Sequence, residues 1–275
     1  MTEWEYGNAE WGDLLTNWNG QPLEYDSIGN LTAFGTEGAA RRELFWNGRQ
    51  LKSIRLGQGA AATSILYEYN SDGLRISRTT TDADGQAAVT KYIYNGDILA
   101  GEIRDDGKSL LFYYDNNGQP FGLRYNGTDY YYLRNLQNDV AAIADGTGAI
   151  AARYYYDAWG NLLSVTDGAG HAVTDAEHIG LVNPIRYRGY YYDSDTGFYY
   201  VSSRYYDPEI GRWISPEPNV YAGAFDSGSG LIGYNVYAYC ANNPVNFSDP
   251  TGEFILTALI VGVVAGAVIG GAIGG

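Results

Sequence analysis

The sequence predicts an all-β protein built from stacked β-hairpins. Its 275 residues include 27 Tyr and 37 Gly but only one Met, and Tyr suits strands because its ring packs while its hydroxyl meets water. Turn signals recur between the β-rich runs: Asn-Gly stands at 19–20, 47–48, 95–96, 117–118 and 126–127, and Asp-Gly at 72–73, 84–85, 106–107, 145–146 and 167–168. Both dipeptides favour two-residue hairpin turns in which both central residues take positive φ. We therefore expect hairpin tips at these positions and little room for long helices.

An aromatic residue followed by Asp or Asn and a short turn containing Gly returns along the first 207 residues. The pairs are Tyr25-Asp26, Trp46-Asn47, Tyr69-Asn70, Tyr94-Asn95, Tyr114-Asp115, Tyr156-Asp157, Tyr192-Asp193 and Tyr206-Asp207. The first five are 20 to 25 residues apart, which is room for one hairpin in each repeat. A single hairpin cannot bury its own face, so neighbouring repeats are expected to join in one continuous sheet.

Three Tyr triplets place aromatic rings on both faces of a strand, because successive side chains alternate. They are Tyr130–Tyr132, Tyr154–Tyr156 and Tyr190–Tyr192. A dry core would carry Val, Ile or Leu on one face. The triplets therefore favour a sheet with a moist concave side and an outer side that faces solvent or another layer.

The segment Leu163–Pro184 interrupts the repeats and is expected to be an irregular loop. Asp175 to Ile179 could form one helical turn capped by Asp175. His171 and His178 are interpreted as loop residues and not as metal ligands.

Residues 185–252 predict a tight β-meander. Its strand segments are Ile185–Tyr192, Gly197–Tyr206 and Arg212–Ser215. The two connections, 193–197 and 207–211, each open with Asp and close with Gly. An Asp carboxylate can accept hydrogen bonds from the N–H groups ahead, and Gly accepts positive φ.

Three pieces of this meander region, RYRGYYYDSDTG, SRYYDPEIGRWIS and NNPVNFSDPTG, resemble the RHS repeat-associated core domain, and the aromatic-Asp pattern over about residues 20–207 resembles YD repeats. The resemblance implies repeats over 1–184 that wind into a hollow β-shell, and a core domain over 185–252 that plugs the end of the shell. It also implies the C-terminal part of a bacterial polymorphic toxin or cell-surface protein that encapsulates a variable C-terminal effector. The alternative is a teneurin-like cell-surface adhesion or carbohydrate-binding module.

In some relatives the RHS core resembles a self-cleaving aspartyl protease that cuts just after a DPxG-type motif. By this resemblance Asp207 in RYYDP and Asp249 in SDPTG match the pattern. Glu217 in ISPEP stands where the family usually carries Asp, and Glu253-Phe254 follow the motif where Leu is usual. The longer Glu side chain would shift its carboxylate by about 1.5 Å, and misplacement on this scale can cost about 100-fold in rate. We therefore expect weak self-cleavage or none, and we favour the alternative that Asp207 and Asp249 simply start Asp-Pro turns.

Four arginines surround these aspartates in sequence: Arg186, Arg188, Arg204 and Arg212. We expect them to pair with Asp193 and Asp207 across strands; the alternative is that they position a substrate segment. Four tryptophans, Trp4, Trp11, Trp18 and Trp46, are interpreted as packing residues in preference to sugar-stacking ones. Cys240 is expected to be a small buried residue.

The tail from 253 to 275 differs from the rest of the chain. Its 22 residues Phe254–Gly275 carry no charge and would span about 33 Å as a helix. Gly262, Gly266, Gly270 and Gly274 recur at every fourth position, the pattern that lets membrane helices approach closely. We expect a helix that enters a bilayer or lies in an apolar groove of a partner, or alternatively occupies the lumen of the shell.

Composition limits the remaining possibilities. The net charge of −15 supplies no basic stripe for nucleic acid. One Cys excludes an internal disulfide, and one Cys with two His argues against a Cys/His metal site; no cofactor is expected. Because no signal peptide opens the chain, a secreted or cell-surface location would require an export signal elsewhere in a larger polypeptide. The expected partners are upstream shell repeats and the chain's own C-terminal effector segment.

Overall fold

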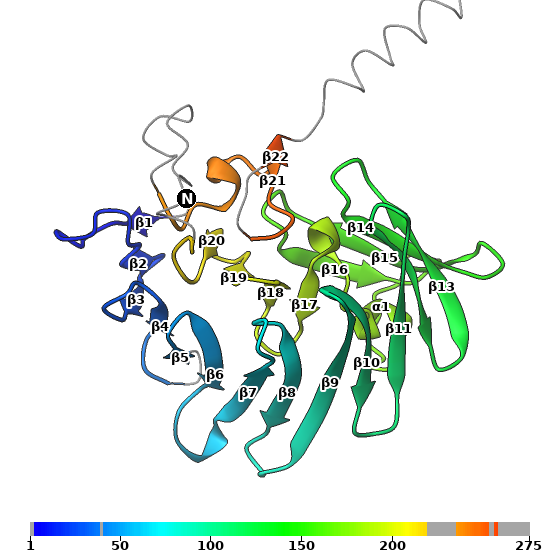
Figure 1. Cartoon of the computed structure of the whole chain (residues 1–275), viewed down its shortest axis with the longest axis horizontal. Helices are drawn as coiled ribbons and strands as arrows, with labels where there is room; N and C mark the ends of the chain where they lie inside the picture. Colours follow the sequence, from blue (N-terminus) through cyan, green and yellow to red (C-terminus); the bar gives the residue numbers. More distant parts are fainter. Residues whose placement is uncertain (1–2, 39–40, 219–234, 253–255, 258–275) are drawn as a thin grey trace, which may run out of the picture.

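The computed structural model describes residues 3–38, 41–218, 235–252 and 256–257. Sixteen strands form one antiparallel sheet in which every strand pairs with its neighbours in sequence. Figure 1 shows this sheet curving into an open arc from β1 to β16. The prediction of an all-β protein made of consecutive hairpins is confirmed.

The strands of the large sheet are short and closely spaced. They are β1 (Trp4–Glu5), β2 (Asn17–Trp18), β3 (Gln21–Tyr25), β4 (Leu31–Phe34), β5 (Arg42–Asn47), β6 (Gln50–Leu56), β7 (Thr63–Tyr69), β8 (Arg75–Thr81), β9 (Ala87–Asn95), β10 (Ile98–Arg104), β11 (Ser109–Tyr114), β12 (Pro120–Tyr125), β13 (Thr128–Arg134), β14 (Val140–Asp145), β15 (Ile150–Tyr156) and β16 (Leu162–Thr166). A 3₁₀ turn, η1 (Gly59–Ala61), precedes β7.

All ten Asn-Gly and Asp-Gly pairs lie at turns of this sheet, but most of the turns are longer than predicted. Both residues take positive φ only at Asn19-Gly20 and Asn126-Gly127. The turn at Asp82 shows the common geometry: its carboxylate accepts from the N–H groups two and four residues ahead, at 2.9 Å each, and Gly85 takes φ +79°. In four of the repeats, the Asp or Asn that follows the aromatic residue is the first residue of such a five-residue turn, and one of its side-chain oxygens closes the turn. These residues are Asp26, Asn70, Asp115 and Asp157.

The aromatic residue of each repeat joins neighbouring hairpins. The Tyr69 hydroxyl donates to the Leu51 carbonyl at 2.8 Å, and the Tyr114 hydroxyl donates to the Leu99 carbonyl at 2.8 Å. The same bond, to a carbonyl 10 to 19 residues earlier, is made by Tyr25, Trp46, Tyr94 and Tyr156. These rings pack against the main hydrophobic cluster. A large ring with a polar tip is what this position requires, which explains the frequency of Tyr.

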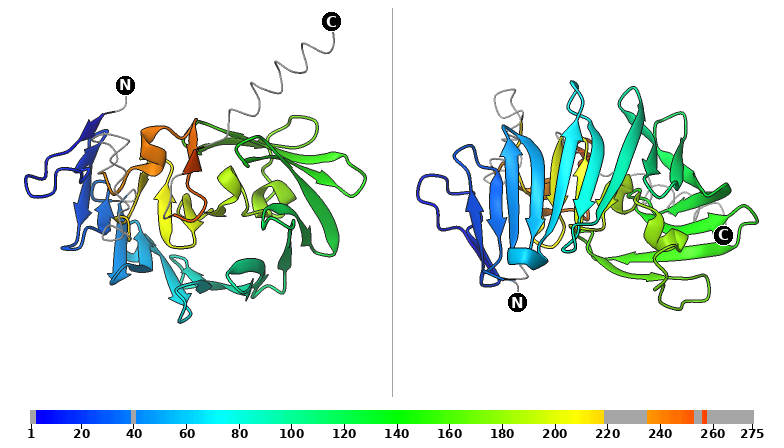
Figure 2. Two further views of the ribbon diagram at one scale, coloured as in Figure 1. Left: turned by 45° about the horizontal axis from the view of Figure 1, so that its top comes forward. Right: turned by 90° about the horizontal axis from the view of Figure 1, so that it is seen from below.

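The predicted meander forms a second, four-stranded antiparallel sheet: β17 (Tyr191–Asp193), β18 (Phe198–Val201), β19 (Arg204–Asp207) and β20 (Arg212–Trp213). Figure 2 shows it within the concave side of the arc. Its first strand is shorter than predicted, because η2 (Tyr187–Gly189) precedes it. The meander and the large sheet share one hydrophobic cluster, which includes Ile65, Leu123, Phe198 and Ile214.

The segment between the two sheets contains one short helix, α1 (Ile179–Val182). The predicted cap at Asp175 is wrong: His178 caps the helix, and its Nδ1 accepts from the Gly180 N–H at 3.1 Å. The Asp175 carboxylate instead accepts from the Glu177 N–H in a turn. The helix begins where burial begins, since Ile179 and Val182 lie in the core.

The last described elements are η5 (Tyr239–Asn242), β21 (Phe247–Ser248) and β22 (Leu256–Thr257), with β21 and β22 paired antiparallel. Leu256 and Thr257 are therefore strand residues, so a helix starting at Phe254 is wrong at these two positions. The rest of the predicted C-terminal helix lies outside the described residues. In the part of the chain that the structure describes, no helix has the length and apolar character needed to cross a membrane.

Candidate functional site

A buried ion pair fastens the meander to the large sheet. Asp193, at the end of β17, accepts from Arg75 Nη1 at 2.5 Å and from Arg75 Nη2 at 3.1 Å. Arg78 Nη1 also reaches Asp193, at 3.1 Å. We call these three residues the core clasp. Arg75 and Asp193 are fully buried, and a buried charge is tolerated only when it is paired and hydrogen-bonded.

Tyrosine rings from both sheets enclose the clasp. Five rings lie 4.4 to 5.8 Å from Arg75 Cζ: Tyr67, Tyr92, Tyr191, Tyr200 and Tyr205. The first two belong to the large sheet and the others to the meander, so the guanidinium joins the two sheets through cation–π contacts as well as through its charge.

The predicted pairing of Arg186, Arg188, Arg204 and Arg212 with Asp193 and Asp207 is wrong for the described residues. Both aspartates face the large sheet and pair with its arginines, Asp193 with Arg75 and Asp207 with Arg42. Arg212 does lie opposite Asp207 in the strand register. Its guanidinium, however, donates to Asn242 Oδ1 at 2.7 Å and to the Tyr6 hydroxyl at 2.8 Å.

Glu217 and Asp249, two of the three predicted self-cleavage residues, meet at Arg204. Arg204 Nη2 lies 2.7 Å from Glu217 Oε2 and 3.4 Å from Asp249 Oδ2. The guanidinium also stacks over Trp213, with Cζ 4.1 Å from the ring. Arg204 and Asp249 are buried, so within the described part of the chain this is a shielded site in which a guanidinium contacts two carboxylates.

Asp207 lies apart from that pair. It is three residues from Arg204 on β19, about 10 Å along the strand and on the opposite face. Its carboxylate accepts from Arg42 Nη1 at 3.3 Å and from the Glu209 N–H at 2.9 Å. The meander turn that follows therefore uses Asp207 in the way the sequence predicts for an Asp-Pro turn.

Side chains of the meander region hold the turn from Asp249 to Gly252. Asp249 Oδ1 accepts from the Gly252 N–H at 2.9 Å, and the Ser203 hydroxyl donates to the Thr251 carbonyl at 2.9 Å. Arg204 Nε donates to the Gly252 carbonyl. Gly252 takes φ +78°, and a Cβ there would lie 2.7 Å from Ser203 Oγ. The carbonyl before the cleavage position implied by the RHS resemblance is thus fixed by an arginine.

The positions of Glu217 and Asp249 can be compared with those that an aspartyl dyad requires. An aspartyl dyad works when two carboxyl groups share one proton and so titrate apart. Among the described residues, the Arg204 guanidinium contacts both carboxylates, whereas a dyad requires the two carboxyl groups to contact each other. The aspartates were visible in the sequence motifs, but Arg204 was assigned to the wrong partners. The alternation of side chains along Arg204–Asp207 was the signal that could have separated it from Asp207.

Burial raises the pKa of Asp207 to about 6, against the lowering effect of Arg42. The pKa of Asp207 in the folded protein exceeds the ordinary value of 3.8, so the folded state binds this proton more tightly than the unfolded state does. The resulting contribution to the free energy of unfolding is fully present below about pH 4 and is lost as the pH rises through 6. We expect wild-type stability to fall by about 3 kcal/mol between pH 4 and 7 relative to Asp207→Asn. Urea denaturation of both proteins across this range checks it, and identical pH profiles would contradict it.

The remaining predicted residues are mostly structural. Cys240 is fully buried beside the tyrosine cluster of the meander, and burial raises the pKa of its thiol to about 12. Trp18 and Trp46 pack against the main cluster, and Trp11 lies 6.1 Å from the Tyr237 ring. These observations confirm the packing interpretation for three of the four tryptophans; Trp4 is 44% exposed.

The fold and the docked meander define a class of protein: a curved sheet of YD-type hairpins that holds its own C-terminal core segment. The family model for the teneurin YD-shell matches residues 13–245, and the chain belongs to this family.

Similar proteins include toxins of several kinds. The chain is 32% identical over 254 residues to tRNA nuclease WapA of Bacillus subtilis (strain 168), covering 91% of this chain and 10% of that protein. It is 28% identical over 286 residues to toxin protein Tse5 of Pseudomonas aeruginosa, covering 94% of this chain and 21% of that protein. It is 25% identical to human Teneurin-4, covering 82% of this chain and 8% of that protein. The chain thus spans about a tenth of the WapA length.

The crystal structure of TcdB2-TccC3 has the same fold, with a TM-score of 0.60 at 22% identity over 84% of this chain and 13% of that chain.

Proposed function

We propose that this chain is the C-terminal shell and core of an RHS-repeat toxin, and that it encloses a variable effector which follows the core. One observation carries the proposal: the core meander is locked into the concave side of the sheet by the buried Arg75–Asp193 pair. The matches to proteins named as a tRNA nuclease and as a toxin support it, because most of this chain matches a small part of each. The division into repeats (1–184), core (185–252) and tail (253–275) belongs to this proposal.

Limited proteolysis of the parent polypeptide tests enclosure. The segment that follows residue 275 should stay intact while an added reporter domain on the outside is cut. Rapid digestion of that segment in a protein whose β-sheet resists protease would overturn the proposal.

The second candidate is a teneurin-like adhesion or carbohydrate-binding module, favoured by the match to Teneurin-4 over 82% of this chain. Saturable glycan or cell-surface binding by residues 1–252, with no protection of a following segment, would select this alternative.

The proposal extends to partners and location. Upstream repeats would continue the sheet, and the assembly would act as a secreted or cell-surface part of a larger polypeptide, with a possible membrane contact through residues 254–275. The charge of −15 argues against nucleic-acid binding by these residues themselves. A nuclease activity such as the one in the WapA name would belong to a different segment.

We further propose that self-cleavage after Gly252 is at most weak and uses Glu217 and Asp249, with Asp207 as the third candidate. Wild-type protein carrying a tag after residue 275 should remain mostly uncut, because Arg204 contacts both carboxylates and Glu217 is longer than Asp. Glu217→Asp should speed release of the tag about tenfold to a hundredfold, measured on gels at pH 5 and 7.

Further variants assign the residues. Asp249→Asn should abolish any release, Asp207→Asn reports whether Asp207 takes part, and Asp175→Asn on an exposed turn is the matched control. Rapid release by the wild-type protein would contradict the prediction of poor cleavage.

A further inference from the structure

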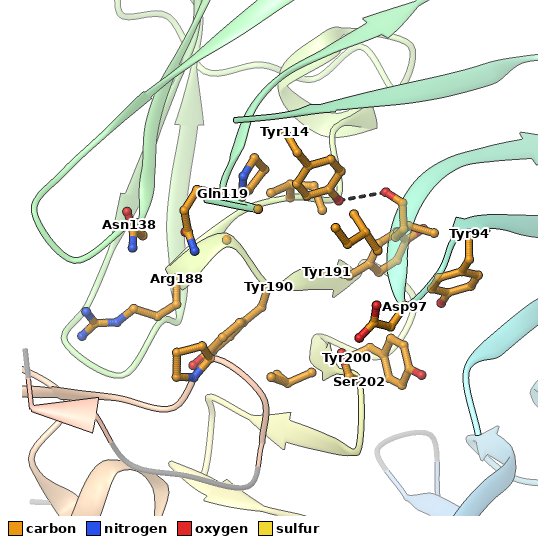
Figure 3. Close-up of a pocket in the computed structure, with 18 of the residues that line it drawn as sticks. Tyr94, Asp97, Tyr114, Gln119, Asn138, Arg188, Tyr190, Tyr191, Tyr200 and Ser202 are labelled. Atoms are coloured by element: carbon orange, nitrogen blue, oxygen red, sulfur yellow. Dashed lines mark hydrogen bonds between the residues drawn. The ribbon is translucent and has the colours of Figure 1, made fainter. Parts of the chain in front are cut away.

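A cavity of about 250 Å³ lies between the inner face of the large sheet and the core meander. Tyrosine rings form its walls, and polar side chains lie around them (Figure 3). The walls are Tyr94, Tyr114, Tyr190, Tyr191 and Tyr200, and the polar residues are Asp97, Gln119, Asn138 and Ser202. Asp97, from the β9–β10 turn, points into the space near Tyr191 and Tyr200 in this view.

The tyrosine walls are held in place from behind. The hydroxyls of Tyr94, Tyr114 and Tyr190 donate to the carbonyls of Arg75, Leu99 and Asp249. Because their hydroxyl groups already donate to these carbonyls, the rings present mainly their faces and edges to a ligand. The ring face carries the negative part of the aromatic quadrupole, so it attracts a cation.

The charges around the cavity leave one carboxylate without an ionic partner. Arg75 forms an ion pair with Asp193 at 2.5 Å. Arg188 lies 3.6 Å from Asp139, and its guanidinium donates to backbone carbonyls and points away from Tyr190 in Figure 3. Among the described residues that line the cavity, only Asp97 is a charged side chain with no ion pair.

The core clasp already shows a guanidinium bound by tyrosine rings and a carboxylate. Arg75 sits among five tyrosine rings with Asp193 as its counter-ion. The cavity is bordered by three of the same rings, Tyr92, Tyr191 and Tyr200, and adds a second carboxylate, Asp97. The Tyr92 hydroxyl, on a buried residue that lines the cavity, has no hydrogen-bond partner among the described residues.

We propose that this cavity binds the basic side chain of a peptide, an arginine whose guanidinium stacks on the tyrosine rings and pairs with Asp97. Arginine suits the site because its planar, weakly hydrated guanidinium stacks on aromatic faces and binds a carboxylate. The volume of about 250 Å³ suits one long side chain, so one arginine of the peptide would occupy the cavity.

Binding of N-acetyl-arginine methylamide, followed by NMR at low salt, tests the proposal. N-acetyl-citrulline methylamide has nearly the same shape without the charge, and it should bind at least about tenfold more weakly. Asp97→Asn should weaken arginine binding by about threefold to fivefold, because this carboxylate is exposed. Asp84→Asn is the matched control: it removes the same charge from the β8–β9 turn and should leave binding unchanged.

Ring variants separate stacking from hydrogen bonding. Tyr94→Phe should keep arginine binding and Tyr94→Leu should lose it. Because Asp97 lies on an exposed turn, its replacement leaves the fold intact and decides the proposal even where Tyr94→Leu is unstable. Equal binding of the arginine and citrulline ligands, or wild-type affinity in Asp97→Asn, would overturn it.

Discussion

Asp193→Asn should lower the free energy of unfolding by about 3–5 kcal/mol, because it leaves Arg75 buried with no full counter-charge. Arg75 and Asp193 are fully buried, and their closest atoms are 2.5 Å apart. The asparagine amide oxygen can still accept hydrogen bonds, but it carries no charge to balance the guanidinium among the tyrosine rings. Urea denaturation followed by tryptophan fluorescence measures the loss.

Asp195→Asn is the matched control for that variant. Asp195 lies two residues further along and contacts Arg78 at 3.5 Å, but its side chain is 31% exposed. A partly exposed ion pair contributes about 1 kcal/mol or less. Equal losses in the two variants would show that the clasp contributes no more than a surface pair.

Gly160→Ala should destabilise the protein by about 2–4 kcal/mol, through backbone strain and steric overlap together. Gly160 takes φ +92°, and a Cβ there would lie 2.6 Å from the Tyr187 ring. That ring cannot move aside easily, because the Tyr187 hydroxyl donates to the Ala158 carbonyl at 2.9 Å. Thermal and urea unfolding both report the change.

Gly118→Ala separates strain from overlap. Gly118 holds the same place in the turn that begins at Asp115 and takes φ +72°, but a Cβ there would meet nothing within 4 Å. We expect a loss of about 1 kcal/mol from backbone strain alone. If both glycine variants lose the same stability, Tyr187 does not pack on the β15–β16 turn as described.

Local features of the fold were predictable from the sequence, and long-range contacts were not. The repeat of an aromatic residue before Asp or Asn predicted the hairpins, and the Asp-to-Gly spacing predicted the turns at 193–197 and 207–211. The partner of Asp193 was missed because Arg75 lies 118 residues away, and no short-range pattern connects the two. The hydroxyl bonds of the repeat tyrosines reach the preceding hairpin, so they appear only once the hairpins are stacked.

The candidate site was predicted in part. The SDPTG and ISPEP motifs led to Asp249 and Glu217, and the structure brings both to Arg204. Asp207 was grouped with them by motif resemblance, although side-chain alternation along β19 sends it to the opposite face from Arg204. Residue type and spacing therefore identified the carboxylates. That Arg204 contacts two of them could be seen only in the three-dimensional structure.

Hydrogen exchange of this chain tests the central claim, that the core meander is locked inside the curved sheet as one cooperative unit. The amides of β17–β20 should exchange only through global unfolding, with the same free energy of opening as β7–β10. Asp193→Asn should lower both by the same amount. Meander amides that exchange at a lower free energy than the large sheet would contradict the claim, because the core would then leave the sheet without unfolding it.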